Sequence, residues 1–451
     1  FITKFAKKNK NGTQTNNSMA QLIIKNIGPI KDVDITLNKV NVIIGPQSSG
    51  KSTINKIACY CTWVEKKVSL DQSFDFFLTG TNFLDRLVEF HKMKGYFRQE
   101  SYIEFSSEVI KITYAYQADA IPTFEWVNQY GYQRTKISYI PAERNVVSLI
   151  AGWEEVKLPN NNIFNFMMDW NMARKAYTPA HSLLIDYIKG NYYYDEEAET
   201  DFLQMENGDK IQLTNASSGQ QSMIPLYLLI RYFTQSIYEK KEDTNVKNKE
   251  REVNLIQQLF LHAFQSIKNN TSILKENESI QDFIETNLFN DNSSNSELTE
   301  KGARFLDSLS KSFSNFIDTK FTSLFIEEPE LNLFPSTQRQ LFYFILQAIQ
   351  KGGHRLFVTT HSPYILYALN NCMMGALVKD EMPEEMAQTL ESCQAWIAPE
   401  LVSAWQIENG QLVSIQEEQT RNIGKHYFNR IMNDTLDEYY TMLNFFNPQK
   451  K

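Results

Sequence analysis

The chain has 451 residues, of which 42% are apolar, and a formal net charge of −8 at pH 7. Its length suits two or three ordinary domains, or one large domain with insertions, and its apolar content supports a real core. The negative charge argues against a surface that coats nucleic acid or an anionic membrane by charge alone, and leaves room only for local basic patches.

The four cysteines have neither paired C-x-x-C spacing nor the density of a disulfide framework: Cys59, Cys61, Cys372 and Cys393. We therefore expect reduced thiols, a cytoplasmic location and no metal cage. The sequence has no apolar run of about 18 residues, which argues against a membrane-spanning helix and a membrane partner. Residues 1–18 are polar and lack the apolar core of a secretory signal, so we interpret them as a disordered extension or a tag remnant.

The first segment of the chain has the pattern of strands. From Ala20, two or three strands are predicted, broken at Gly28-Pro29 and at residues 37–39, and the last of them is the apolar run Val40 to Ile44. A helix is expected to begin near Gly50.

The middle of the chain changes character twice. Residues 70–135 mix aromatic and alternating runs, which suits an antiparallel sheet, and Asn207-Gly208 predicts a two-residue turn between the strands of a hairpin. Residues 236–318 are charged or polar, and we interpret them as an insert of helices. Apolar strands return at "SLFIEEP" and "RLFVTTH", each followed by a helix. A second Asn-Gly hairpin and a helix from about Glu417 to Leu443 complete the chain.

The segment "GPQSSGKST" has the pattern of a phosphate-binding loop. Gly45, Gly50, Lys51 and Ser52 fit G-x-x-x-x-G-K-[ST], with an apolar strand before the loop and a helix after it. The glycines let backbone N–H groups converge on phosphates at the helix start, Lys51 supplies a positive charge, and the Ser52 hydroxyl ligates magnesium. The other phosphate-binding candidates in the loop are Ser48, Ser49 and Thr53. The sequence therefore predicts ATP and Mg2+ as cofactors.

Three further motifs each have an ordinary structural explanation. Glu327 and Glu328 end a buried strand, where carboxylates can hold magnesium through water and orient the attacking water, but they could equally mark a helix N-terminus. His361 ends another strand, where it could reach a terminal phosphate or simply pack. The segment "NASSGQQS" precedes an apolar helix and could be an ordinary N-cap, and its candidate residues are Ser217, Ser218, Gly219 and Gln220.

The order of these four motifs is that of the ABC class of ATPases. From about residue 20 to 370, the sequence most closely resembles the branch shared by SMC, RecF and OLD (overcoming-lysogenization-defect) proteins, which includes ATPase subunits of bacterial anti-phage systems. The resemblance rests on the opening up to the phosphate loop, on "EEPELNLFP" and on "TTHSPYIL". It implies an α/β fold: an ABC-type ATPase head, with a mixed sheet, an antiparallel flank and a helical lobe, plus a helical insert and a C-terminal β-hairpin and helix.

The predicted division of the chain follows these motifs. After the extension at 1–18, an ATPase lobe with the phosphate loop spans 19–150 and a helical lobe with the signature motif spans 151–235. The helical insert at 236–318 separates these from the rest of the ATPase lobe at 319–371 and from the C-terminal hairpin and helix at 372–451.

The resemblance also implies a mechanism. In the family, two subunits pack head to tail, so that Ser217 and Gly219 of one copy would cap the γ-phosphate held by Gly50 and Lys51 of the other. Glu328 matches the catalytic carboxylate and His361 the switch histidine that senses the γ-phosphate. Glu327 matches a magnesium position at which the wider class has aspartate, and we expect slow ATP hydrolysis as a result.

The sequence departs from the family pattern at several positions. Ala142 stands where the glutamine loop has its glutamine, so Glu143 or Arg144 is a candidate for the missing magnesium or phosphate contact, and a surface ion pair is the alternative. Pro225 should kink the signature helix or delay its start. Two other departures should not abolish binding: Gln47 and Phe334.

Three functions fit the sequence. The first is an ATPase that acts as a homodimeric switch for a separate effector, expected to be a nuclease, in anti-phage defence. Residues 362–451 contain no D-x-D pair of a TOPRIM nuclease, because Asp434 and Asp437 are one residue too far apart. The second is a recombination or repair ATPase that clamps DNA through a basic stripe, although a solvated helix face explains that stripe better. The third is a non-turnover ATP-binding scaffold. The basic stripe consists of Lys240, Lys241, Lys247, Lys249 and Arg251.

Overall fold

The computed structural model describes residues 20–117, 120–150, 152–153, 157, 159–239, 259 and 313–446. The extension at 1–18, the basic stripe and almost all of the insert predicted at 236–318 lie outside these described residues.

The main sheet is mixed and has 11 strands in the order β6-β5-β4-β1-β2-β15-β14-β3-β13-β12-β7. Strands β1, β2, β4, β5 and β6 pair in antiparallel fashion and form the predicted flank. This mixed α/β architecture confirms the predicted fold class. The strand bounds are Ala20–Ile27 (β1), Ile30–Leu37 (β2), Val40–Ile44 (β3), Tyr102–Ser106 (β4), Ile110–Ala115 (β5), Thr123–Trp126 (β6), Thr135–Ile140 (β7), Phe321–Glu327 (β12), Arg355–Thr360 (β13), Val402–Glu408 (β14) and Gln411–Ser414 (β15).

The centre of the sheet is parallel. Strands β14, β3, β13, β12 and β7 are neighbours that all run in the same direction. All of β3, and all but the first residue of β12 and of β13, are buried. Such apolar runs are typical of strands covered on both faces. Because the carboxyl ends of parallel strands lie at one edge, the segments that follow β3, β12 and β13 meet there.

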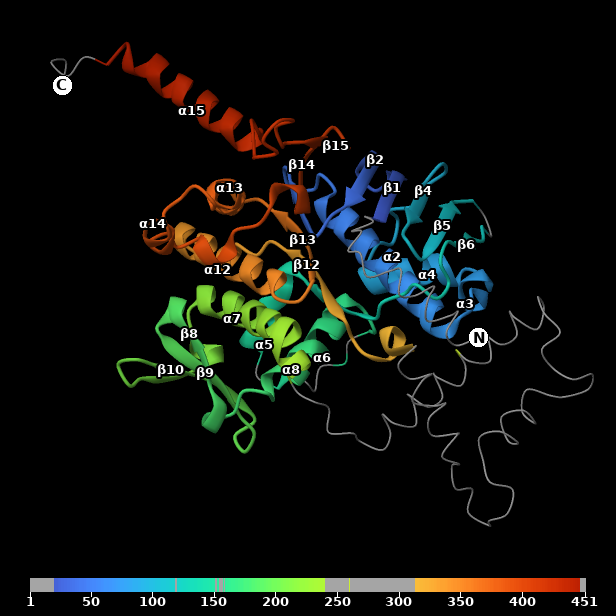
Figure 1. Ribbon diagram of the computed structural model, residues 1–451, viewed down its shortest axis with the longest axis horizontal. Coiled ribbons are helices and arrows are strands. Elements are labelled where there is room, and N and C mark those ends of the chain that lie inside the picture. The colour runs from blue at the N-terminus through green and yellow to red at the C-terminus, as the bar shows by residue number, and fades with distance from the viewer. Residues whose placement is uncertain are drawn as a thin grey trace, which may run out of the picture.

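Helices cover both faces of the main sheet (Figure 1). On one face α2 and α4 pack on Ile43 and Phe325, and on the other α6, α7, α12 and α13 pack on Val42 and Ile326. The helix bounds are Lys51–Asp71 (α2), Asp75–Leu78 (α3), Asn82–His91 (α4), Val146–Leu149 (α5), Asn162–Arg174 (α6), Ser218–Arg231 (α7), Ile237–Glu239 (α8), Pro335–Gln350 (α12), Pro363–Val378 (α13), Glu384–Gln388 (α14) and Tyr427–Leu443 (α15).

A second, four-stranded antiparallel sheet in the order β11-β10-β9-β8 lies within the lobe predicted to be helical, so this lobe is mixed. The hairpin predicted around Asn207-Gly208 is present, but its turn is wider than predicted. The N–H of Met205 donates to the carbonyl of Asp209 at 2.8 Å, and only Gly208 in the turn has a positive φ, of 93°. The strand bounds are Leu183–Ile185 (β8), Gly190–Asp195 (β9), Thr200–Met205 (β10) and Lys210–Gln212 (β11).

The second Asn-Gly hairpin has the predicted two-residue turn. Glu408 pairs with Gln411, and Asn409 and Gly410 both have positive φ, of 53° and 82°. This hairpin belongs to the C-terminal unit predicted at 372–451. In the structure its strands instead lie inside the main sheet, where β14 pairs with β3 and β15 with β2.

Two predictions of local structure are wrong. Residues 75–91 form the helices α3 and α4 rather than strands, because Phe83, Leu87 and His91 recur every four residues and are buried on one face. The last helix begins at Tyr427 rather than near Glu417, since the preceding residues form a loop closed by the bridge between Gln416 and Ile423.

The last helix, α15, projects away from the rest of the molecule (Figure 1). None of its residues is buried, and its exposed large apolar side chains include Ile431, Leu436 and Tyr439. None of the described helices is long and apolar enough to cross a membrane.

Candidate functional site

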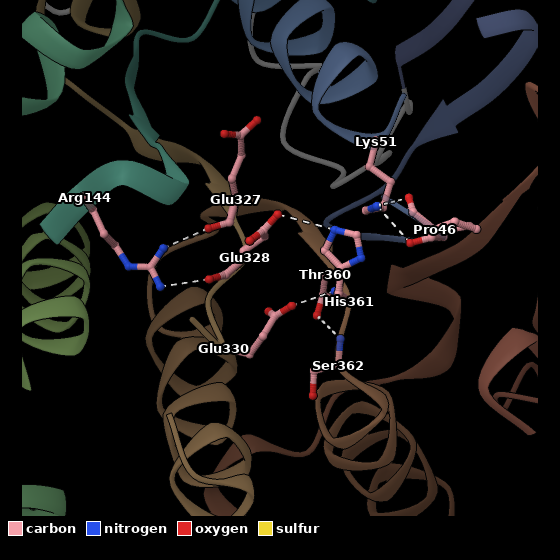
Figure 2. Close-up of polar contacts among 10 residues, drawn as sticks. Pro46, Lys51, Arg144, Glu327, Glu328, Glu330, Thr360, His361 and Ser362 are labelled. Carbon is pink, nitrogen blue, oxygen red and sulfur yellow. Dashed lines mark hydrogen bonds and ion pairs between the residues drawn. The ribbon is translucent and has the colours of Figure 1, made fainter. Parts of the chain in front are cut away.

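The phosphate loop joins β3 to α2. Its Gly50 has a φ of 106° and precedes the first residue of α2, and a Cβ at this position would lie 2.4 Å from Cδ1 of Ile30, so glycine is required. The Nζ of Lys51 donates hydrogen bonds to the carbonyl oxygens of Gly45 at 2.9 Å and Pro46 at 2.7 Å (Figure 2). The loop therefore folds around the ammonium group of Lys51.

The other predicted loop residues differ in exposure. Ser48 is exposed and has a φ of 58°, Ser52 is half-buried in the first turn of α2, and Thr53 is buried. The Ser49 hydroxyl oxygen is buried and has no hydrogen-bond partner in the structure. Ser48, Ser49 and Ser52 are thus at least partly open to solvent, although the hydroxyl oxygen of Ser49 is not.

The charge of Lys51 is set by two opposing effects. Burial lowers its pKa to about 8, while the nearby carboxylates of Glu328, Glu330 and Glu327 act to raise the pKa. Because a pKa of about 8 lies above neutral pH, Lys51 keeps its positive charge under physiological conditions. A cation held among carboxylates at the start of a helix is suited to an anionic ligand.

Glu328 and His361 face each other beside the phosphate loop (Figure 2). Glu328 directly follows β12 and His361 directly follows β13, and the His361 Nε2 lies 3.4 Å from the Glu328 Oε1. The hydrogen bond from His361 is the main reason why the pKa of Glu328 is lowered, so this carboxylate is ionised at neutral pH. Glu328 has a φ of 44°, which is uncommon for a residue with a side chain.

Glu330 was given no separate role in the sequence analysis, although it belongs to the quoted "EEPELNLFP" motif. Its Oε1 accepts a hydrogen bond of 2.6 Å from the backbone N–H of His361. Burial raises the pKa of Glu330, and its Oε2 is buried without a partner. Glu330 therefore fixes the backbone that carries His361.

Glu327 is buried and extends in a different direction from Glu328 (Figure 2). Its Oε1 accepts a hydrogen bond of 2.6 Å from the hydroxyl of Tyr139 on β7. Burial, together with the charge of Glu327, raises the pKa of Tyr139 well above its usual value, so the tyrosine remains a donor. Sequence reasoning missed this contact, because Tyr139 carries no motif of its own and approaches only through the pairing of β7 with β12.

Arg144 is fully buried in the short 3-10 helix η1 (Ala142–Asn145), so the prediction that it forms a surface ion pair is wrong. Its guanidinium donates hydrogen bonds only to backbone carbonyls in the structure, at 2.8–3.4 Å. This leaves no N–H free, and the alternative prediction of a phosphate contact from Arg144 does not hold either. The accepting carbonyls belong to Pro141, Ser222, Glu327, Glu328 and Pro329.

The neighbouring Glu143 is exposed on the same turn. The structure describes no hydrogen bond or ion pair from its carboxylate to another described residue. Its role as a magnesium ligand therefore stays a prediction.

The signature motif forms the start of α7. Ser217 is the N-cap, and its hydroxyl and the Gln220 side chain form a reciprocal capping box. Ser217 and Ser218 are exposed, whereas Gly219 packs so tightly that a Cβ there would lie 3.1 Å from the carbonyl oxygen of Asn332. This helix start thus contacts the loop after β12 and presents two hydroxyls to solvent.

Pro225 does not delay the start of this helix. Residue Ser218 is already helical, and α7 continues through Pro225 to Arg231. The prediction of a delayed start is therefore wrong, and Ser217 caps the helix directly.

The residues at this edge fit a magnesium–triphosphate group. A hydroxyl on Ser52 and carboxylate oxygens on Glu327 are the hard oxygen donors that magnesium prefers, and the ion usually keeps water and phosphate oxygens as its other ligands. Among the described residues, no group of three or more His, Cys, Asp or Glu residues is arranged to hold a metal ion. Such a cage is not needed where the phosphates complete the coordination.

A strand, a glycine-rich loop and a helix beside an acidic strand end have the geometry of a P-loop nucleotide-binding domain. A family model described as an AAA ATPase domain matches residues 239–366, which include the acidic motif and His361 but not the phosphate loop. No curated protein matches the chain.

Several solved structures are similar to the chain. The SMC head domain from Thermotoga maritima is 11% identical, with 89% of this chain and 99% of that chain covered and a TM-score of 0.35. The recombination mediator protein RecF is 11% identical over 88% and 99% of the two chains, with a TM-score of 0.30. A nucleotide-free ATP-binding cassette from an ABC transporter is 12% identical over 89% and 93%, with a TM-score of 0.24. At these TM-scores the similarity does not bear on function.

Proposed function

We propose that this chain binds and hydrolyses Mg-ATP and acts as a homodimeric switch subunit for a separate effector, a nuclease in anti-phage defence. The observation that carries the ATPase proposal is the pair formed by Glu328 and His361, 3.4 Å apart, beside Lys51 at the carboxyl ends of adjacent parallel strands.

We propose a step for each group. Lys51 would exchange its bonds to Gly45 and Pro46 for phosphate oxygens, and its positive charge would offset theirs. Glu328 is ionised and half-exposed, so it can accept a proton from the attacking water. His361, next to it, would contact the terminal phosphate. Mg2+, when held by Ser52 and Glu327, would supply further charge neutralisation of the phosphates.

The proposal of a homodimer is supported by the exposed end of α7. A helix start carries partial positive charge and free N–H groups, so it favours an anion. Ser217 and Ser218 are exposed at this start, and Phe334, on the loop that packs against Gly219, is 75% exposed. An exposed phenyl ring next to an exposed helix start suits a surface that a second copy covers around a shared ATP.

The effector and the role in defence rest on the motif resemblance alone. No D-x-D pair occurs in residues 362–451, so a nuclease activity would belong to another polypeptide. The reading frame next to this gene should then encode a nuclease, and a neighbouring gene with no nucleic-acid chemistry would count against this part of the proposal.

The ATPase proposal can be tested by steady-state hydrolysis and nucleotide binding. Glu328→Gln should bind ATP as well as the wild type does. Its turnover should be at least about 100-fold slower, because a general base typically contributes ~10²–10⁴-fold. Glu438→Gln, the same substitution on the exposed face of α15, serves as the control and should keep wild-type turnover. A wild type that binds ATP without turnover would instead favour the scaffold function, and near-normal turnover in Glu328→Gln would remove the role assigned to this residue.

A further inference from the structure

A cavity of about 570 Å³ lies at the β7 edge of the main sheet, between α2, α4 and the start of α6. Its volume is within the ~300–1,000 Å³ typical of small-molecule sites. The residues of α2 that line the cavity begin at Cys59, so along the helix axis they lie about 12 Å or more from Lys51 at a rise of ~1.5 Å per residue. The cavity is therefore separate from the phosphate loop.

The cavity is rich in positive charge. Lys66, Lys67, Arg86 and Lys136 line it, whereas Glu89 is the one acidic residue in its lining. Such a concentration of cations is unexpected in a chain with a net charge of −8. It indicates a site for an anion.

Two of these cations have no carboxylate partner among the described residues. Lys67 pairs with Asp71 and Lys136 with Asp169, each at 2.6 Å. In contrast, Lys66 donates to the backbone carbonyl of Thr135, and the Arg86 guanidinium lies 5.8 Å from the centre of the Phe76 ring. Burial and the nearby cations Arg134 and Lys136 lower the pKa of Lys66 to about 8, and the carboxylate of Asp169, which pairs with Lys136, opposes this only in part.

Aromatic rings and an unsatisfied histidine form other parts of the wall. Tyr60, Trp63, Phe76 and Phe90 line the cavity, and their flat faces suit a planar ring. His91 also lines it, is 1% exposed, and has a buried Nδ1 with no hydrogen-bond partner. Burial lowers the pKa of His91 to about 3, so its imidazole is neutral.

We propose that this cavity is a second ligand site, which binds a small organic anion with a planar ring and has the chemistry of a nucleoside monophosphate. The phosphate would lie against Lys66 and Arg86, the two cations without a carboxylate partner. The base would stack on the aromatic wall formed by Tyr60, Trp63, Phe76 and Phe90.

The cavity is connected to the ATPase site through Tyr139. The ring of Tyr139 lines the cavity, while its hydroxyl donates to Glu327 at 2.6 Å. Lys136, another lining residue, lies on the same strand, β7, which pairs with β12. A ligand that shifts this strand or this ring changes the position of Glu327, and the occupied site therefore regulates ATP turnover.

Binding is tested by calorimetric titration of the full chain carrying Lys51→Ala with the four 5′-ribonucleoside monophosphates. This background removes the phosphate loop as a competing site, so the result does not depend on whether the protein hydrolyses ATP. We expect at least one monophosphate to bind with a Kd below about 1 mM, and Arg86→Gln and Lys66→Gln each to weaken it about tenfold, the effect of losing one charge-assisted contact. Arg86 is exposed, so its variant should fold even if Lys66→Gln does not.

Lys94→Gln removes one positive charge from an exposed residue outside the cavity and is the matched control, which should bind like its parent. Failure of all four monophosphates to bind, or binding that Arg86→Gln and Lys94→Gln affect equally, would overturn the site.

The link between this cavity and the ATPase site has its own test. The bound monophosphate should change wild-type ATP turnover at least threefold, and Tyr139→Phe should retain binding but lose this response. A response that survives in Tyr139→Phe would refute the proposed connection.

Discussion

The guanidinium of Arg144 reaches three segments of the chain at once. Its hydrogen bonds join η1 to α7 through the carbonyl of Ser222, and to the end of β12 through the carbonyls of Glu327 and Glu328. Burial lowers its pKa to about 10, and the surrounding carboxylates oppose this change, so the side chain stays charged. A single residue therefore links the start of the acidic loop to the helix that carries the signature motif.

Arg144→Met should lower the free energy of unfolding by about 3 kcal/mol or more, because it leaves buried carbonyls without donors. Arg144→Lys, which keeps the charge but offers fewer donors in a different geometry, should be intermediate. Urea unfolding measures both, and turnover should fall together with stability because the backbone of Glu328 loses its support.

Arg430→Met on α15 is the control for this series, because the Arg430 side chain is 60% exposed and its ion pair with Glu408 is long, at 3.8 Å. It should change stability by no more than about 0.5 kcal/mol. If Arg144→Met proved as stable as the wild type, the buried guanidinium would be replaceable by apolar volume, as for some other buried charges.

At this scale, the local motifs predicted which residues would lie together, whereas their roles stay predictions. Lys51, Glu328 and His361 lie together as the motifs indicate. Tyr139 and Glu330 could not be assigned, because their contacts depend on strand register and on which way a carboxylate turns. The burial of Arg144 has the same origin: nothing in "PAERN" distinguishes an arginine that covers carbonyls from one in solvent.

Among the elements, the β14–β15 hairpin shows how one turn joins distant parts of the sheet. The carbonyl of Gly410 accepts hydrogen bonds from the N–H groups of Lys31 at 2.8 Å and Asp32 at 3.3 Å. A Cβ on Gly410 would lie 2.7 Å from the carbonyl oxygen of Pro29. The turn therefore needs glycine for its positive φ and also for its close approach to the β1–β2 turn.

The two Asn-Gly hairpins offer a matched pair of substitutions. Gly208→Ala meets only backbone strain, since no atom lies within 4 Å of its Cβ position, and should cost about 1–2 kcal/mol. Gly410→Ala adds a clash with backbone and should cost about 3 kcal/mol or more. Thermal or urea unfolding of both variants measures the difference, and equal losses would show that the hairpin can move away from Pro29 at little cost.

Element prediction succeeded where the periodicity was unambiguous. Strands β1 to β3 lie close to the predicted positions, and the helix after Gly50 begins at Lys51 as predicted. Helix α4 was missed because aromatic residues such as Phe83 favour strands and hide a helical repeat in a short segment. The late start of α15 was missed because "EEQTRNIGKH" contains charged residues that suit a helix as well as a loop.

In the whole molecule, the proposed dimer connects the two halves of the site. Each copy would hold ATP with its own phosphate loop and cap the ATP of the other copy with Ser217. Within one copy, Gly219 contacts Asn332, and the amide of Asn332 donates to the Ser222 hydroxyl at 2.8 Å. The loop after β12 thus lies between Glu328, the proposed catalytic carboxylate, and Ser217, the proposed cap, so hydrolysis in one site would change the contacts at the other.

Light scattering in the Glu328→Gln background tests this arrangement. With Mg-ATP the protein should become a dimer, and adding Ser217→Arg should leave it monomeric with nucleotide binding intact, because the larger side chain blocks the cap. Ser414→Arg, at the exposed end of β15, should still allow the dimer. A dimer that forms equally well with Ser217→Arg would mean that this helix start does not seal the partner's site.

The arrangement of the sheet is the part that local patterns could not provide. The strands β14 and β15 follow β13 along the chain but lie between β3 and β2. Their position depends on contacts between segments more than 350 residues apart, such as the pairing of Val402 with Val40. A hairpin pattern predicts that two strands pair with each other, but it does not predict which other strands of a sheet they pair with.

The isolation of α15 has a thermodynamic consequence. None of its 17 residues is buried, Phe428 in its first turn is its one contact with the described hydrophobic core, and helices of about this length are only marginal in water by themselves. Its helix–coil equilibrium is consequently decoupled from the cooperative unfolding of the sheet. On heating, the free chain should lose this part of its helicity gradually and well before the main transition, so its melting curve would have a sloping shoulder instead of a single step.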